Sequence, residues 1–111
     1  NLCVLCDDDP SRGRGLGRQT MPETARYSTV CAIQNLWLAA RVEGLGVGWV
    51  SILDQGELRR ILALPDRLAV VAYLCVGYVR AFAAEPDLKR AGWESGAPLE
   101  AVVHRERYVE P

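Results

Sequence analysis

The stretch YSTVCAIQNLWLAARVEGLGVGWVSI, residues 27–52, decides the fold of this chain. It holds neither glycine nor proline over 27–43, and Gly44 is a natural helix stop, so we predict a long helix over 27–43. Within 30–40 only two residues are polar, and apolar side chains cover nearly the whole circumference. A helix of this kind must be surrounded, and we expect a second copy of the chain to cover it as a homodimer.

The start of this helix is ambiguous in the sequence. Thr20-x-x-Glu23, with Pro22 inside it, is one capping signature, because a threonine side chain followed by glutamate at the third position satisfies free backbone N–H groups. Ser28 is a later candidate N-cap. Both starts remain open from the sequence alone.

Apolar runs separated by turn residues predict the other elements. A short apolar strand is expected at Trp49–Leu53, and Asp54 is expected to cap a helix from Gln55 to Leu62. The remaining expected elements are a buried strand at 1–6, a central strand at 69–79, a helical turn from Glu85-Pro86 to near Gly92, and an edge strand at 101–109. This order predicts an α+β (mixed α/β) layered fold in one domain, 1–111.

Composition excludes several classes of protein. With 50% apolar and 24% charged residues in 111, the chain is an ordinary globular domain and not a disordered tail. The formal net charge of -1 disfavours nucleic-acid binding through a basic surface. No apolar run reaches the roughly 20 residues that a membrane-spanning helix needs. The chain opens in an apolar run at Asn1 without a methionine, so we expect a missing N-terminal portion.

The four cysteines lie in apolar stretches and not in polar loops, which favours free thiols in a reducing, cytoplasmic setting. Cys3 and Cys6 form a C-x-x-C motif. Side chains three residues apart in a strand point to opposite faces, and there is no second pair or nearby histidine to complete a zinc site. We therefore predict buried packing and no metal.

Other motifs are weaker still. The glycine patterns at 13–17 and 44–48 suggest phosphate loops, but neither fits G-x-G-x-x-G. His104 is the only histidine and has no evident acid partner, so we expect a surface residue. Three arginines form a basic loop that we expect to be solvated, with anion binding as the alternative: Arg12, Arg14 and Arg18.

Ser51 is the most informative polar residue. It is expected inside an apolar strand, three residues past a glycine run, and a buried hydroxyl needs a hydrogen-bond partner. That partner is either neighbouring backbone or the polar edge of a ligand. The residues alone favour the backbone.

The run at 27–41 together with the segment at 43–52 resembles the nitroreductase superfamily, and more narrowly its 5,6-dimethylbenzimidazole synthase branch. The resemblance spans essentially the whole chain, and the GWVSI segment is specific to the branch. Further matching pieces are 74–79 (LCVGYV), Glu85-Pro86-x-Leu88, Gly92-Trp93 and Pro98-Leu99-Glu100.

The resemblance implies a fold, a partner and a chemistry. Members have a mixed sheet flanked by helices, a long hydrophobic helix at the dimer interface, and FMN bound between two subunits. They are about twice as long as this chain, which would then be the C-terminal portion of one domain. In the synthase branch reduced FMN reacts with O2 and is itself converted to 5,6-dimethylbenzimidazole for vitamin B12. FMN is then a substrate as much as a cofactor, O2 is a co-substrate, no metal takes part, and a separate flavin reductase could supply the reduced flavin.

The resemblance also assigns site residues. Ser51 matches the branch's active-site serine near the flavin ring, where its hydroxyl would bond the ring or assist proton movement, and this reverses the preference for a backbone partner. Gly48, Trp49 and Val50 would approach the ring edge. The family's phosphate clamp and the branch's catalytic aspartate have no counterpart here, and Glu94 stands where a basic residue is often found.

Three functions follow from the sequence. The first is the synthase. The second is a generic nitroreductase in which NAD(P)H reduces FMN, and the GWVSI serine favours the synthase over it. The third is a catalytically silent, truncated dimerising domain, which the missing phosphate clamp favours for this chain in isolation.

Overall fold

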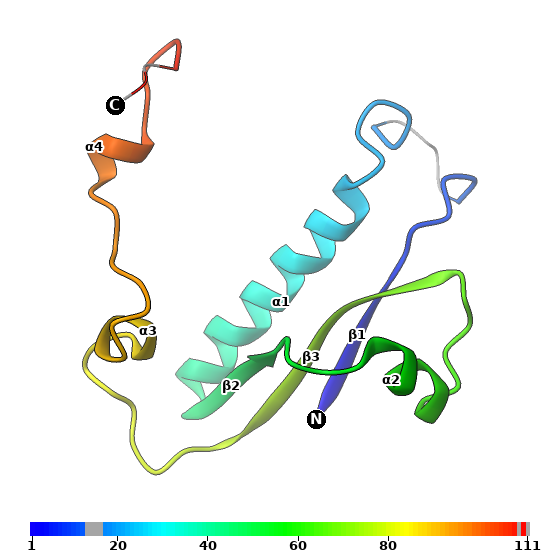
Figure 1. Cartoon of the computed structure of the whole chain (residues 1–111), viewed down its shortest axis with the longest axis horizontal. Helices are drawn as coiled ribbons and strands as arrows, with labels where there is room; N and C mark the ends of the chain where they lie inside the picture. The colour runs from blue at the N-terminus through cyan, green and yellow to red at the C-terminus, as the bar shows by residue number, and fades with distance from the viewer. Residues whose placement is uncertain (13–16, 109, 111) are drawn as a thin grey trace. The chain divides into compact units, whose positions relative to one another are not determined.

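The computed structural model describes residues 1–12, 17–108 and 110, and the chain divides into two compact units, Asn1–Arg80 and Ala81–Pro111. The larger unit contains a three-stranded antiparallel sheet with two helices (Figure 1). The smaller contains two short helices. Helices and a sheet occur together in the larger unit, so the α+β fold class is confirmed.

The sheet has the order β1-β3-β2, with β1 at Leu2–Asp7, β2 at Leu45–Val50 and β3 at Leu68–Tyr78. The predicted central strand is confirmed, because β3 pairs with both neighbours and its Leu74 has no exposed surface. The predicted strand at 1–6 is present, but it is an edge strand and only Cys6 in it is buried. Its apolar character therefore did not mean complete burial within this unit.

The long helix, α1, spans Thr24–Val42 and packs against the sheet (Figure 1). It begins between the two predicted starts, at an N-cap residue, Glu23, whose side chain makes no capping hydrogen bond. Its end is confirmed, because Gly44 follows with a φ of 75°, a left-handed conformation that suits glycine. Ile33 and Ala40, seven residues apart, are its only buried side chains among the described residues, so a narrow stripe holds it to the sheet.

The strand after this helix lies earlier than predicted. The sequence predicted Trp49–Leu53, whereas β2 runs from Leu45 to Val50. Backbone pairing explains the difference, because Leu45 lies opposite Tyr78 and the ladder continues to Val50 opposite Tyr73. The glycines interpreted as a lead-in segment are therefore inside the strand.

Helix α2, Gln55–Ile61, confirms the predicted helix and its cap. The Asp54 carboxylate accepts a hydrogen bond from the Glu57 backbone N–H at 2.9 Å. In the last turn of this helix, the Arg59 guanidinium donates to three backbone carbonyls of the segment that leads into β3, those of Pro65, Asp66 and Leu68. No sequence pattern indicated this contact, which fixes where β3 begins.

The smaller unit differs from the prediction at its end. The helical turn is confirmed as α3, Asp87–Arg90, and Gly92 follows it with a φ of 70°. The edge strand predicted at 101–109 is wrong, because α4 occupies Leu99–Val102 and the described residues after it are irregular. A strand needs a neighbour for its backbone groups, and no described segment supplies one here, whereas Pro98 is compatible with a helix start.

The cysteines are free thiols in the structure, with Cys6 buried and Cys31 and Cys75 exposed. Burial raises the pKa of the Cys3 thiol above its ordinary value, which disfavours a reactive thiolate at the C-x-x-C motif. Among the described residues no three His, Cys, Asp or Glu side chains gather as metal ligands. Nor does any helix in that part of the chain have the length and apolar character to cross a bilayer.

An ion pair between Arg26 and Asp8 joins the end of β1 to the first turns of α1. The Arg26 guanidinium donates to Asp8 Oδ2 from both Nε, at 2.7 Å, and Nη2. This hydrogen bonding from Arg26 holds the pKa of the Asp8 carboxyl below its ordinary value. The ion pair links segments 18 residues apart and closes the loop between them.

We expect the Asp8→Asn variant to be less stable than the parent chain at neutral pH, by a margin that shrinks as the pH falls below about 4. A carboxyl whose pKa is lowered by folding stabilises the native state above its unfolded pKa, about 3.9, and loses this effect as the pH falls through the folded value. Thermal melts from pH 7 to pH 3 measure the difference. Asp87→Asn, which breaks an exposed pair with Arg90 within α3, is the control and should shift Tm little. A Tm difference for Asp8→Asn that stays constant over this range would contradict the assignment.

Candidate functional site

The predicted site residues lie where β2 ends. Side chains alternate between the two faces of the sheet along β2. Trp49, the cross-strand partner of the buried Leu74, is on the face that α1 covers, while Gly48 and Val50 are on the other face. Beyond Val50 the chain bends, with the Leu53 N–H donating to the Ser51 carbonyl at 3.1 Å. The bend and the Asp54 cap together turn the chain into α2.

Three of the four predicted residues share one small pocket. Trp49, Val50 and Ser51 line a hollow of about 120 Å³ together with Gln55 and Tyr73. A mostly apolar hollow of about 240 Å³ adjoins it under α2 and shares Val50 and Tyr73 with it. The structure thus brings a hydroxyl, an amide and an aromatic ring to one place.

Ser51 is not buried inside a strand, as the sequence suggested. It follows the last residue of β2, is exposed, and its hydroxyl forms no hydrogen bond with any described residue. The argument that a buried hydroxyl requires a partner therefore does not apply. What the structure offers instead is an unoccupied donor and acceptor at the rim of a pocket.

Gly48 lines a different hollow, of about 420 Å³, between β2 and β3. Its other lining residues include Gly46, Cys75 and Gly77, and in the sheet Gly46 lies opposite Gly77 and Gly48 opposite Cys75. These small residues form a flat floor on the face of the sheet away from Leu74. A Cβ atom added at Gly48 would have no neighbour within 4 Å, so this glycine leaves space that the described chain does not fill.

The charged residues around these hollows limit what the hollows can bind. No lysine or arginine is among the residues lining the three hollows around Gly48–Ser51, and the charged residues there are the acidic Asp54 and Glu57. Hydrogen bonding from Arg60 keeps the pKa of Glu57 below its ordinary value, so this carboxylate stays ionised. The site therefore suits a flat, largely uncharged ring and not a phosphate.

The remaining candidates lie elsewhere. Arg12 forms ion pairs with Asp7 and Asp9, while Arg14 lies outside the described residues. Arg18 is half-buried beside the end of β1, so it is not the fully solvated side chain that we expected. Of the two glycine patterns, 13–17 lies mostly outside the described residues, and 44–48 begins at the glycine that follows α1 and continues into β2.

His104, in the smaller unit, is half-buried, and its ring lies 4.7 Å from that of Tyr108. His104 is therefore a partly exposed residue whose ring packs against a neighbour four residues away.

The chain matches known proteins along most of its length. The model of the nitroreductase family matches residues 1–78. A protein of Rhodospirillum rubrum is 54% identical over 97 residues, which cover 87% of this chain and 46% of the relative. Two proteins of Rhodobacter capsulatus are 46% and 40% identical over 99 residues, covering 89% of this chain and 48% of each relative. All three are named 5,6-dimethylbenzimidazole synthase, and this chain spans about half their length.

Two alanine variants separate a glycine that packing requires from one that it does not. A Cβ at Gly46 would overlap Val79 Cγ1, so Gly46→Ala forces this partly exposed side chain to move and should cost about 1 kcal/mol of stability. Gly48→Ala meets no atom and should leave the unfolding free energy nearly unchanged. Urea denaturation of the two variants measures the contrast. Equal losses in both would show that Gly48 is also constrained by packing.

Proposed function

The chain belongs to the nitroreductase family, and we propose that it forms the flavin-ring half of a 5,6-dimethylbenzimidazole synthase, which converts reduced FMN and O2 to 5,6-dimethylbenzimidazole. The observation that carries the proposal is the similarity to named synthases over nearly nine tenths of this chain. The free hydroxyl of Ser51 beside two adjoining hollows supports it independently.

We assign the flavin ring to the surface formed by Gly48, Trp49, Val50 and Ser51. The space above Gly48 and the flat glycine floor fit a planar ring, since no side chain of the described residues occupies it. When bound, FMN would supply the redox chemistry with O2. This chain's residues would bind and orient the ring, and Trp49, whose side chain lies on the opposite face of the sheet from Gly48, would approach the ring edge through its backbone.

Ser51 is the residue that we propose as catalytic. Its hydroxyl can both donate and accept a hydrogen bond, and no described residue engages it. A hydroxyl at this position can hold a proton near the reacting ring and return it, which is the kind of assistance that positioned side chains give. Gln55, in the same pocket, offers an amide to orient that hydroxyl.

The flavin phosphate needs a different partner. Because no basic side chain lines these hollows, the residues that line them would contact the flavin ring, and the phosphate would be held by residues outside the three hollows. If no such residues join it, the chain is the silent dimerising domain that the sequence left as an alternative. The presence or absence of bound flavin distinguishes the two.

We propose that the homodimer forms through α1. The side of this helix that the sheet leaves uncovered carries large apolar residues, among them Leu36, 37% exposed, and Leu38, 57% exposed. Burial of such a surface against a second copy would be strongly favourable, at about 25 cal/mol per Å². We further propose a cytoplasmic location, because the four thiols are free, and a flavin reductase as the source of reduced FMN.

Leu36→Glu should convert the dimer to a monomer. It places a charge in the proposed interface, where desolvation without a partner is costly, whereas α1 keeps its hold on the sheet through Ile33 and Ala40. Size-exclusion chromatography with light scattering measures the mass. Ile61→Glu, at a residue of α2 that is 63% exposed, is the matched control and should leave the dimer intact. An unchanged dimer for Leu36→Glu would mean that α1 is not the interface.

The synthase proposal is tested by aerobic incubation of the chain with reduced FMN, followed by chromatography for 5,6-dimethylbenzimidazole. We expect the product, and a decrease of about tenfold or more in Ser51→Ala, since a positioned proton donor typically contributes roughly 10²–10⁴-fold. Ser95→Ala, an exposed serine of the smaller unit, should behave like the parent chain. FMN that cycles without being consumed would indicate the generic nitroreductase instead, and protein that binds no flavin would indicate the silent domain.

A further inference from the structure

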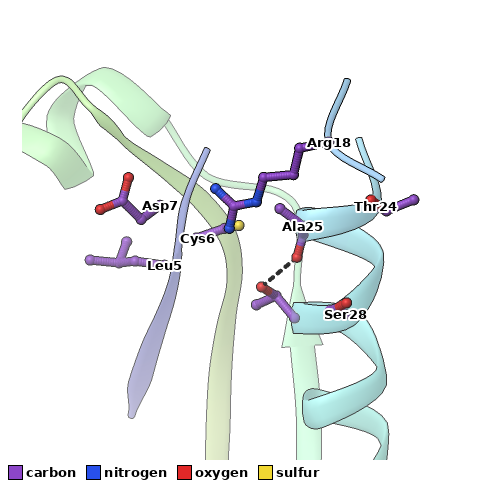
Figure 2. A pocket seen from close by; sticks show the side chains of 8 residues that line it. Leu5, Cys6, Asp7, Arg18, Thr24, Ala25 and Ser28 are labelled. Carbon is purple, nitrogen blue, oxygen red and sulfur yellow. Dashed lines mark hydrogen bonds between the residues drawn. The ribbon is translucent and has the colours of Figure 1, made fainter. Parts of the chain in front are cut away.

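A separate pocket of about 390 Å³ lies between the end of β1 and the first turns of α1. Figure 2 shows the Arg18 side chain extending into it, with Cys6 on the strand side and Thr24, Ala25 and Ser28 on the helix side. It shares no lining residue with the hollows around Gly48–Ser51. Its volume is within the range of small-ligand sites.

Arg18 differs from the three other arginines around it. Arg12 and Arg67 pair with Asp7 at 2.9 and 2.8 Å, and Arg26 pairs with Asp8. Arg18 forms no ion pair with a described residue, and its Nη1 donates to a neutral group, the Asp9 carbonyl, at 2.7 Å. That bond anchors the guanidinium and leaves its other N–H groups available.

The charge of this cluster is unbalanced by one. Four arginines meet three aspartates, and each aspartate has an arginine within 4.0 Å. Asp7, which also lines the pocket, is neutralised by two guanidinium groups. Arg18 acts electrostatically on Asp8 and Asp9 but forms an ion pair with neither, so direct contact with an anion from solution would stabilise it.

The helix wall of the pocket supplies a second free donor. Two of its hydroxyls are already engaged, since Thr24 donates to the Met21 carbonyl at 2.7 Å and Thr29 to the Ala25 carbonyl at 3.0 Å. Ser28 has no hydrogen bond with a described residue. The pocket therefore has free donors on two walls, the planar guanidinium of Arg18 and the hydroxyl of Ser28. Such a pair of donors matches a ligand group with several acceptor oxygens.

We propose that this pocket binds a phosphate group, either as free phosphate or on a small phosphate ester. The Arg18 fork would hold two of its oxygens, as guanidinium groups do with phosphate, and Ser28 would donate to a third. Asp7, held by Arg12 and Arg67, forms the adjacent wall. The site does not depend on the flavin assignment, because its residues are different ones.

Phosphorus NMR titrations of the intact chain at low ionic strength test the proposal. Inorganic phosphate and glycerol 3-phosphate should both broaden on adding protein, whereas thermal melts with uncharged glycerol should show no saturable stabilisation. Arg18→Gln should weaken phosphate binding about tenfold or more, because it removes a charged hydrogen bond. Arg60→Gln, which removes the same charge from an exposed pair on α2, is the matched control and should bind within about twofold of the parent chain.

The carrier of the phosphate is distinguished by competition. Displacement of inorganic phosphate by FMN would identify a flavin as the carrier, and displacement by glycerol 3-phosphate but not by FMN would identify a small ester. Should Arg18→Gln fail to fold by circular dichroism, Ser28→Ala replaces it and should weaken binding about two- to fivefold. The proposal is overturned if the parent chain shows no saturable phosphate binding, or if the folded variant of Arg18 or Ser28 binds as tightly as the parent.

Discussion

The structure depends on how α1 packs onto one face of a three-stranded sheet. Ile33 lies against Ala72 and Leu74, and these three form the buried cluster of the larger unit. A stripe this narrow holds the helix, but it leaves much of α1 exposed, and on the opposite face of the sheet it leaves Gly48, Cys75 and Gly77 exposed. Both apolar surfaces proposed for function, the dimer helix and the glycine floor, exist because so little of the unit is needed for its core.

Much of the fold could be predicted because its signals are local. Asp54 caps α2 by accepting a hydrogen bond from a residue only three positions later. Gly44 ends α1 because it adopts a left-handed backbone conformation, and β3 is apolar over most of its eleven residues. The position of β2 could not be predicted, since glycines weaken the strand pattern and its register comes from distant Tyr73 and Tyr78. As a result, Ser51 was predicted inside the strand, whereas it follows the strand and is exposed.

The candidate site could be predicted only in part. The segment containing Gly48 and Ser51 was identified by its resemblance to a known family. The structure adds that Gly48 and Ser51 line two different hollows. The arginines at 12, 14 and 18 suggested a solvated basic loop, with anion binding as the alternative. Which arginine lacks a carboxylate is decided by contacts over as many as 60 residues, such as that of Arg67 with Asp7, and no pattern in the sequence encodes them.

The strand order has a consequence for how the protein behaves at high concentration. Among the described strands, β1 and β2 each pair on one side only, so each presents an open row of backbone donors and acceptors. Such edges recruit other strands unless charge, proline or a covering segment blocks them. β1 ends at the charged Asp7, which discourages pairing with another strand there, but β2 contains no charged residue. Edge-to-edge aggregation would therefore begin at β2 whenever its outer row is left bare.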